Sequence, residues 1–262
     1  MAPLPHGPTA PVNQSYILFE AYSPVVELRQ YTLHPGQRDV LIELFEREFI
    51  ESQEATGIRV IGQFRDLDNP DRFVWLRGFA DMPARARALQ AFYGGPVWQA
   101  HRDTANPTMV DSDNVLQLCP AYAVSGFQIE RRPRAPVGES GDGPGLVVAT
   151  LYHFDAAVDE DFLAFFADEL VPVLEKCGAA VSAALVNDAT PNNFPALPVR
   201  EGEHVFAWFA RFADVQAFDR HRAALEALPA WRERLQPALL RRLSRPPETL
   251  RLAPTLRSRL HG

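Results

Sequence analysis

Several residue types that mark common protein classes are rare in this sequence. Among 262 residues there are two cysteines, Cys119 and Cys177, and a single lysine, Lys176. Two cysteines in separate parts of the chain favour reduced thiols in a cytoplasmic protein over a disulfide framework. The scarcity of lysine argues against a Schiff base, and neither a P-loop nor a dinucleotide-binding glycine motif occurs.

Charge and hydrophobic runs argue against two further classes of partner. The net charge is −7, which disfavours a nucleic-acid-binding surface. No apolar run reaches the roughly 18 residues that a membrane span needs. The histidines show no metal-binding spacing of the HExxH kind. We therefore expect no nucleic acid, no membrane and no metal, and the sequence implies no cofactor.

What the sequence does contain is one module repeated twice. Tyr31 and Tyr152 lie 121 residues apart, and this offset also aligns Leu41, Leu44, Phe45, Phe49 and Gly57 with Phe162, Phe165, Phe166, Leu170 and Gly178. Further along, an offset of 133 aligns Phe73, Trp75, Phe79, Pro96 and Trp98 with Phe206, Trp208, Phe212, Pro229 and Trp231. Changes of offset place insertions in loops, where they are tolerated. The segment 187–202 is the longer loop of the second half.

Each half predicts the order strand–helix–strand–strand–helix–strand. The first half has strands at 25–33, 58–65, 73–79 and 115–118, with helices at 37–56 and 81–90 and a shorter helix from Pro96. The second has strands at 147–154, 179–186, 204–212 and 249–252, with helices at 160–176 and 214–228. This is the split βαβ order. The predicted fold class is α+β, with two tandem ferredoxin-like (βαββαβ) domains packed sheet to sheet as an intramolecular α/β barrel.

The predicted boundaries follow from composition and from the repeat. Residues 1–24 form a flexible N-terminal arm, 25–130 the first ferredoxin-like domain, 131–145 a linker rich in Pro, Gly and charge, and 146–256 the second, diverged domain. Closure within one chain is expected because a linker of about 15 residues gives a high effective concentration. The alternative is that each half pairs with a half from another chain. We also expect a homodimer.

The opening strand resembles a known family motif. Residues 26–36 read VELRQYTLHPG, similar to the Glu-Leu-Arg-x-Tyr-x-x-x-x-Gly motif of NIPSNAP proteins. Pro-x-Trp at 96–98 and Leu-x-Leu-x-Pro ending at Pro120 also resemble that family. The resemblance is weaker over 147–254, where Val148, Thr150 and Tyr152 replace Glu, Arg and Tyr. It implies a tandem, bacterial-type member of the dimeric α/β-barrel superfamily. Its ferredoxin-like sheets pack face to face around a pocket, and its members include cofactor-free monooxygenases, isomerases and haem enzymes.

Candidate site residues come from polar side chains on the strands. Because side chains alternate along a strand, Glu27, Arg29 and Tyr31 share one face. We expect this face to meet the partner sheet, since the more apolar face suits helix packing. On the neighbouring strand Trp75 and Arg77 share a face and border Arg29. An arginine beside aromatic walls can hold a carboxylate or an enolate.

The expected roles follow from the chemistry of each side chain. Arg29 orients an anionic or carbonyl-bearing substrate, and Glu27 or His101 moves a proton. The substrate-binding residues are Tyr31, Trp75, Arg77, Tyr152 and Trp208. The alternative is a structural ion pair of Glu27 with Arg29 or Arg77 that only joins the two sheets. For His101 the alternatives are an axial haem ligand and a solvated surface histidine; Trp98 is interpreted as a core residue.

Two functional classes remain open. The first is an enzyme or binding protein that holds a small-molecule ligand between the sheets, with proton-transfer or oxygenation chemistry that needs no cofactor. It is favoured because Glu27, Arg29 and Arg77 have no charged copies at Val148, Thr150 and Ala210. The second is a non-catalytic interaction or stress-associated protein whose halves present a surface to partners. A cavity filled by aromatic side chains would favour this second class.

Overall fold

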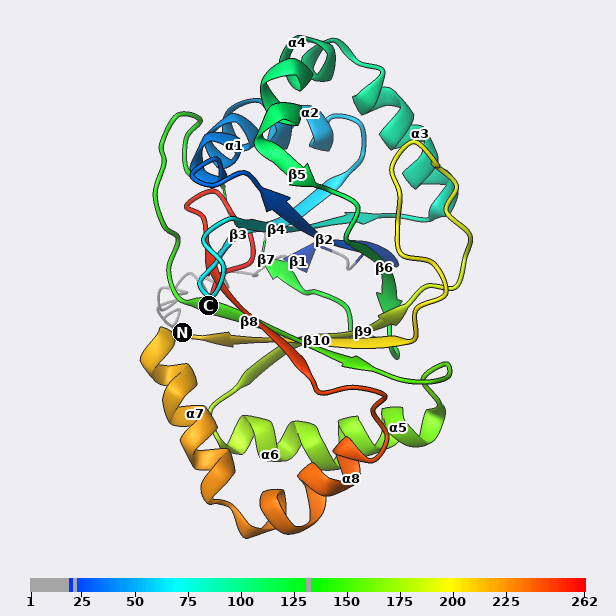
Figure 1. Cartoon of the computed structure of the whole chain (residues 1–262), viewed down its shortest axis with the longest axis vertical. Coiled ribbons are helices and arrows are strands. Elements are labelled where there is room, and N and C mark those ends of the chain that lie inside the picture. Colours follow the sequence, from blue (N-terminus) through cyan, green and yellow to red (C-terminus); the bar gives the residue numbers. More distant parts are fainter. Residues whose placement is uncertain (1–18, 21–22, 131–132) are drawn as a thin grey trace, which may run out of the picture.

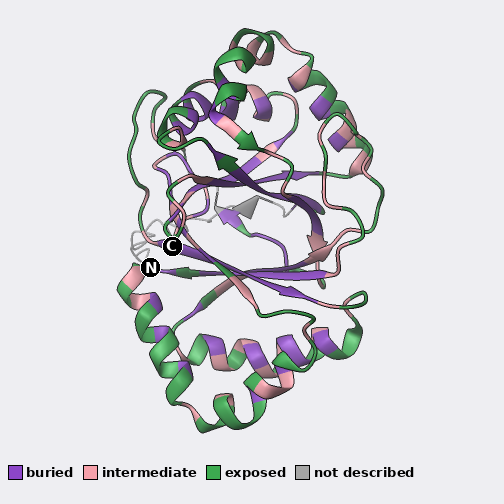
Figure 2. Cartoon of the chain, viewed as in Figure 1, coloured by how far each residue is buried: buried purple, intermediate pink, exposed green. Residues whose placement is uncertain are grey.

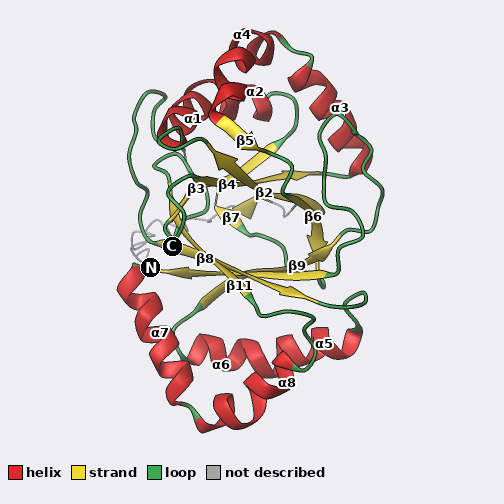
Figure 3. Ribbon diagram, viewed as in Figure 1, coloured by secondary structure: helices red, strands yellow, loops and turns green. Residues whose placement is uncertain are grey.

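The computed structural model describes residues 19–20, 23–130 and 133–262. Most of the predicted N-terminal arm, and the first two residues of the predicted linker, therefore lie outside the described residues. The rest of the chain forms two layers of helices with strands between them (Figures 1 and 3). No helix in the described part is long and apolar enough to cross a membrane.

The first half follows the predicted order of elements. Its strands are β2 (Val25–Leu33), β3 (Arg59–Asp66), β4 (Arg72–Phe79), β5 (Met109–Asp111) and β6 (Val115–Pro120), and its helices are α1 (Arg38–Leu44), α2 (Ile50–Glu54), α3 (Met82–Tyr93) and α4 (Pro96–Ala105). A π-helical stretch, Phe45–Phe49, joins α1 to α2, so the predicted long helix is continuous but locally underwound, with more residues per turn than an α-helix. Asp81 caps α3 by accepting a hydrogen bond from the Ala84 amide at 2.5 Å.

The second half repeats this order of elements, with equivalent helix caps and an equivalent glycine after its first helix. Its strands are β8 (Leu146–His153), β9 (Ala180–Asn187), β10 (Val205–Phe212) and β11 (Glu248–Pro254), and its helices are α5 (Glu160–Ala164), α6 (Val171–Lys176), α7 (Val215–Ala227) and α8 (Gln236–Leu240). Asp214 caps α7 as Asp81 caps α3. Gly57 and Gly178 follow the first helix of each half at φ of 94° and 101°, a region that favours glycine.

The strands close into one antiparallel barrel of eight. Around the barrel the order is β2, β4, β3, β11, β8, β10, β9 and β6, and β6 pairs back with β2. The two halves meet at two seams, β3 with β11 and β6 with β9. The α+β barrel is thus confirmed, and the sheets are joined by hydrogen bonds at their edges. Helices α1–α4 cover one side of the barrel and α5–α8 the other (Figure 1).

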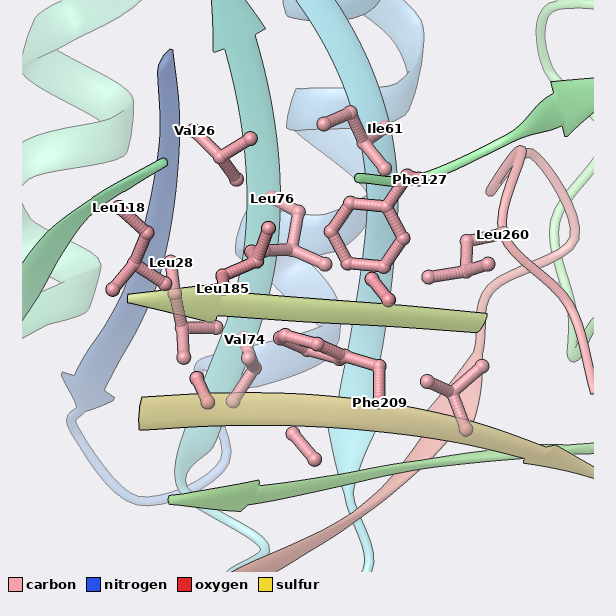
Figure 4. Packing of buried hydrophobic residues seen from close by; sticks show 14 of the residues in the cluster. Val26, Leu28, Ile61, Val74, Leu76, Leu118, Phe127, Leu185, Phe209 and Leu260 are labelled. Carbon is pink, nitrogen blue, oxygen red and sulfur yellow. The ribbon is translucent and has the colours of Figure 1, made fainter. Parts of the chain in front are cut away.

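The barrel interior is filled with apolar side chains. Val26 and Leu28 of β2 lie there with Leu76 of β4 and Phe209 of β10, and Phe127 comes from the segment before β7 (Ile129–Glu130), a short strand that pairs with β1 (Phe19–Glu20). The rings of Phe127 and Phe209 meet edge to face, with centroids 4.9 Å apart. Figure 4 shows these side chains pointing toward one another across the strands. The space between the two sheets is therefore core.

The predicted faces of the first strand were assigned the wrong way round. Glu27, Arg29 and Tyr31 point toward the helices of the first half, while Val26 and Leu28 fill the barrel. The prediction failed because it assumed that the more apolar strand face packs on helices. In this barrel the interior holds the mainly apolar face of the first strand, which includes one buried amide, Gln30, and the helix-covered side holds charged groups that bind one another. Both faces of the strands are buried (Figure 2).

Candidate functional site

A buried group of charged residues lies beneath the helices of the first half. Glu27, Arg29, Arg77 and Arg85 are each no more than 1 % exposed, so one carboxylate faces three guanidinium groups. Strand pairing places Glu27 directly opposite Arg77 and Arg29 opposite Trp75, and α3 supplies Arg85. We call these four residues the charge cluster.

Glu27 is the hub of the charge cluster. Its Oε2 accepts hydrogen bonds from Arg29 Nη1 at 2.5 Å and from Arg77 Nε at 2.7 Å, and its Oε1 accepts one from Arg85 Nε at 2.6 Å. Burial opposes ionisation of Glu27, but the charges of Arg77, Arg29 and Arg85 outweigh it and hold its pKa well below the ordinary value. Glu27 is therefore a fixed anion at neutral pH.

Aromatic side chains contact the arginines of the charge cluster. The guanidinium carbons of Arg29 and Arg77 lie 5.6 Å and 5.1 Å from the centre of the Trp75 ring. Arg29 Nε donates a hydrogen bond to the Tyr31 hydroxyl at 3.0 Å, and Arg77 Nη1 donates one to the Tyr93 hydroxyl at 3.4 Å. Burial raises the pKa of Tyr31, so its hydroxyl stays protonated at neutral pH.

A cavity of about 340 Å³ opens beside these aromatic residues. It lies between the strands and the helices of the first half, and its lining includes Tyr31, Phe45, Phe49, Gln53, Trp75, Phe92, Tyr93 and Trp98. Phe194, Ala196 and Leu197 close it from the long loop of the second half. We call it the first-half cavity. This cavity lies on the helix side of the sheet, whereas the pocket was predicted between the two sheets.

Three of the polar side chains that line the first-half cavity have a donor or acceptor position left for a ligand. The Tyr31 hydroxyl accepts from Arg29, which leaves its own proton free to be donated. The indole Nε1 of Trp75 and the Oε1 of Gln53 are buried, and neither has a hydrogen-bond partner among the described residues. Gln53 Nε2 donates to the Phe49 carbonyl at 3.0 Å, which identifies Oε1 as the free acceptor. In a mainly apolar site, these two donors and one acceptor can orient a hydroxyl or a carbonyl group.

The second half has a cavity of its own with different chemistry. It measures about 710 Å³, and its lining includes Tyr152 and Trp208, the counterparts of Tyr31 and Trp75. At the position of Gln53, however, the second half carries Leu174, which also lines this cavity. Phe218 stands where the first half has Arg85. The second half therefore retains the aromatic wall without a counterpart of the charge cluster.

The structure brings some predicted site residues together and separates others. Glu27, Arg29, Arg77, Tyr31 and Trp75 form one group, as expected, although on the helix side. Tyr152 and Trp208 lie in the other cavity, with the whole barrel in between.

His101 does not belong to the lining of the first-half cavity. It is 31 % exposed, its Nε2 lies 3.5 Å from Glu48 Oε2, and its ring packs edge-on to Phe49. This surface position does not fit an axial haem ligand. Among the described residues, no group of three or more His, Cys, Asp or Glu could hold a metal. Trp98, interpreted as core, packs against Phe92 and Phe49 and also lines the cavity.

Three features of the site were missed from the sequence. Arg85 is one of two arginines on α3, and Gln53 is one polar residue near a helix end, so neither stands out. Asn192 and Asn193 lie in the long loop, and their Oδ1 atoms accept hydrogen bonds from Arg85 Nη1 at 3.0 Å and 2.8 Å. The available signal was the comparison of the two halves, because Arg85 and Gln53 align with Phe218 and Leu174.

A comparison with protein families matches the first half of the chain. The family model described as NIPSNAP matches residues 26–121, which contain β2 to β6 and the whole charge cluster. No curated protein matches the chain in sequence.

Solved structures match nearly the whole chain at low sequence identity. A Fusobacterium nucleatum protein provisionally assigned as a monooxygenase is 10 % identical, with a TM-score of 0.53 over 90 % of this chain and 94 % of its own. A Lactobacillus acidophilus protein with the same provisional assignment is 14 % identical, with a TM-score of 0.52 over 88 % and 94 %. An anthrone oxidase-like protein is 15 % identical, with a TM-score of 0.51 over 91 % and 95 %. At these identities the likeness shows the fold alone.

Proposed function

We propose that the first half of this chain, which the NIPSNAP family model matches over residues 26–121, binds a small, mostly apolar molecule carrying one hydroxyl or carbonyl oxygen. The ligand lies in the first-half cavity, among the rings of Phe45, Trp75, Tyr93 and Trp98. Such a site is concave, mainly aromatic and supplied with few polar groups, as small-molecule sites generally are.

One observation carries this proposal: the cavity lining contains buried polar groups that nothing in the described chain satisfies. A buried donor or acceptor without a partner costs about 1–3 kcal/mol, so such groups are rare in stable proteins unless a ligand or water binds them. Trp75 Nε1 and Gln53 Oε1 are both of this kind, and the Tyr31 proton is free. A ligand hydroxyl would accept from Tyr31 or Trp75 and donate to Gln53.

The charge cluster gives this site its chemistry. The fixed positive charge of Arg29 polarises the Tyr31 hydroxyl, which makes it a stronger donor toward a developing oxyanion. The site thus favours reactions that pass through an enolate or a phenolate. These include proton transfer at carbon and, with dioxygen as co-reactant, oxygenation of an electron-rich ring. The name of one structural neighbour, anthrone oxidase-like, supports an aromatic substrate, and the name monooxygenase of another supports oxygenation. Glu27 is held as an anion by three arginines, so it serves to position them.

The same proposal covers domain organisation and assembly. Residues 25–130 and 146–256 are two diverged copies of one ferredoxin-like domain, supported by the shared order of elements and by the equivalent caps and glycines. The protein is a cytoplasmic homodimer. Superposition of the halves tests the first statement, and light scattering tests the second, since a mass of 29.3 kDa at all micromolar concentrations would contradict a dimer.

A second candidate function is a non-catalytic interaction protein in which the charge cluster is structural. It is favoured by one observation: Arg29, Arg77 and Arg85 do not themselves line the first-half cavity. On this alternative the cluster only fastens β2, β4 and α3 together, and no ligand depends on Tyr31.

The deciding experiment compares Tyr31→Phe with Tyr152→Phe, a matched substitution in the second half. Binding of 2-naphthol and of naphthalene is measured by isothermal titration calorimetry. Loss of one hydrogen bond weakens binding by about 1 kcal/mol, or about fivefold. We expect Tyr31→Phe to weaken 2-naphthol by this factor and to leave naphthalene unchanged, and Tyr152→Phe to change neither. Equal weakening of both probes, or no binding by the unmodified protein, would favour the non-catalytic alternative.

A further inference from the structure

The long loop between β9 and β10 covers the cavity of the other half. It runs from residue 188 to residue 204, whereas the corresponding loop of the first half, between β3 and β4, has only residues 67–71. The difference of twelve residues accounts for the change in repeat offset from 121 to 133. In Figure 1 this loop, drawn in yellow, rises from β9 and β10 past the barrel to α3. Loops of this length in compact domains are usually functional.

The tip of the loop is fastened to the first half by polar contacts. Arg85 Nη1 donates to the Oδ1 atoms of both Asn192 and Asn193, and Asn193 Nδ2 donates to the Met82 carbonyl at 2.6 Å. A hydrogen bond within the loop also stabilises its conformation, since Asn192 Nδ2 donates to the Leu197 carbonyl at 2.9 Å. Arg85 is at the same time a partner of Glu27, so the loop tip is linked to the charge cluster through one side chain.

The apolar residues of the loop enter the cavity wall. Phe194 stacks on Tyr93 with ring centroids 6.2 Å apart and planes tilted by 29°, and Tyr93 in turn meets Trp98 edge to face at 4.9 Å. Phe194 and Leu197 both line the first-half cavity, and both are only partly buried. An aromatic residue that is stacked at a cavity wall and half open to solvent can move without disturbing the core.

Together these contacts make the first-half cavity a composite of both halves. We propose that residues 188–204 form a lid that selects the ligand of this cavity, with Phe194 and Leu197 setting the length of the aromatic molecule that is bound. This inference rests on the proposed function, since it assigns the size limit of the same site. Flat ligands of two fused rings lie under Phe194, and longer ones collide with it. Opening and closing of the lid centre on the Arg85 contacts to Asn192 and Asn193.

The test measures selectivity between two probes of different length. Dissociation constants for 2-naphthol and for 2-anthrol, which has one more fused ring, are determined for the unmodified protein, for Phe194→Ala and for Phe154→Ala. Phe154 is a control because it is also a half-buried phenylalanine of the second half, packed on Phe162 and absent from the cavity lining. A hydrophobic size mismatch is worth about tenfold or more. Phe194→Ala should therefore shift the ratio of the two constants toward 2-anthrol by about tenfold, and Phe154→Ala should leave it unchanged.

A second measurement needs no variant and keeps the inference testable if Phe194→Ala fails to fold. Amide hydrogen exchange of residues 192–197 is compared with and without saturating 2-naphthol, and a lid that closes over the ligand should exchange more slowly when the probe is bound. An unchanged ratio of dissociation constants in a folded Phe194→Ala, or unchanged exchange in the loop while the probe binds, overturns the lid and leaves the proposed function standing. Failure of the unmodified protein to bind either probe overturns both.

Discussion

Glu27→Gln removes the only anion of the charge cluster and leaves three guanidinium groups buried without a counter-charge. The substitution keeps the shape of the side chain, so packing is little changed and the effect is electrostatic. Three hydrogen bonds of 2.5 to 2.7 Å lose their charged acceptor. Removing one partner of a buried ion pair typically costs about 3–5 kcal/mol. Since Glu27 serves three arginines, we expect the upper part of this range.

The assay is urea unfolding at pH 7, followed by circular dichroism, with thermal unfolding in parallel. A loss of about 4 kcal/mol is a large share of the roughly 5–15 kcal/mol of a typical protein. It lowers the midpoint of thermal unfolding by roughly 10 °C for a chain of this size. A loss below about 1 kcal/mol would refute the reasoning, because it would show that water or ions screen the cluster.

Glu46→Gln is the matched control, since Glu46 is also a buried glutamate but with the opposite pKa shift. Burial raises the pKa of Glu46 despite hydrogen bonds from Thr255 and Arg257, whereas the arginines lower that of Glu27. The stabilisation from Glu27 is thus present above its unfolded pKa of about 4.5 and is lost as pH falls. Glu46 contributes most below that pH and loses its contribution as pH rises through its folded pKa. The stability difference between unmodified protein and variant should therefore grow from pH 4 to 7 for Glu27→Gln and shrink for Glu46→Gln.

Two further predictions concern the second half and the barrel. Burial lowers the pKa of His221, which lies in the wall of the second cavity, so the folded protein binds a proton at this residue less readily than the unfolded chain. As the pH falls from 7.5 to 5.5, the unmodified protein should therefore lose stability relative to His221→Phe. A difference between their urea midpoints that stays constant over this pH range would contradict this. Phe209→Ala empties the middle of the barrel, where the side chain is fully buried; it should cost about 3–5 kcal/mol by urea unfolding, against less than about 0.5 kcal/mol for the exposed Val110→Ala.

The order of elements and the closed barrel could be predicted because they depend on periodicity and on the repeat. Turn and cap residues such as Gly57, Asp81 and Asp214 act locally, so their roles are visible in sequence. The repeat then aligned each strand of one half with its counterpart in the other half, and this alignment needs no information on tertiary contacts.

The orientation of the first strand could not be predicted because both of its faces are buried. Alternation shows that Glu27 and Arg29 share a face, but not which layer that face meets. That choice depends on Arg85, whose approach from α3 is a tertiary contact with Glu27 at a separation of 58 residues. The loop tip is a similar case: the length of residues 188–204 marks an insertion, but only the fold shows that Asn192 and Asn193 reach Arg85.

Closure of the barrel within one chain also has a consequence for how such a site can diversify. When two identical subunits form a barrel, every substitution is made twice, and any change that suits one pocket is imposed on the other. Here both seams join segments of a single polypeptide, so the two pockets mutate separately. The first half carries Arg29, Gln53 and Arg85, whereas the second has other residues at these positions and a longer loop. Covalent linkage thus permits the two cavities to have different side chains, which exact two-fold symmetry between identical subunits would forbid.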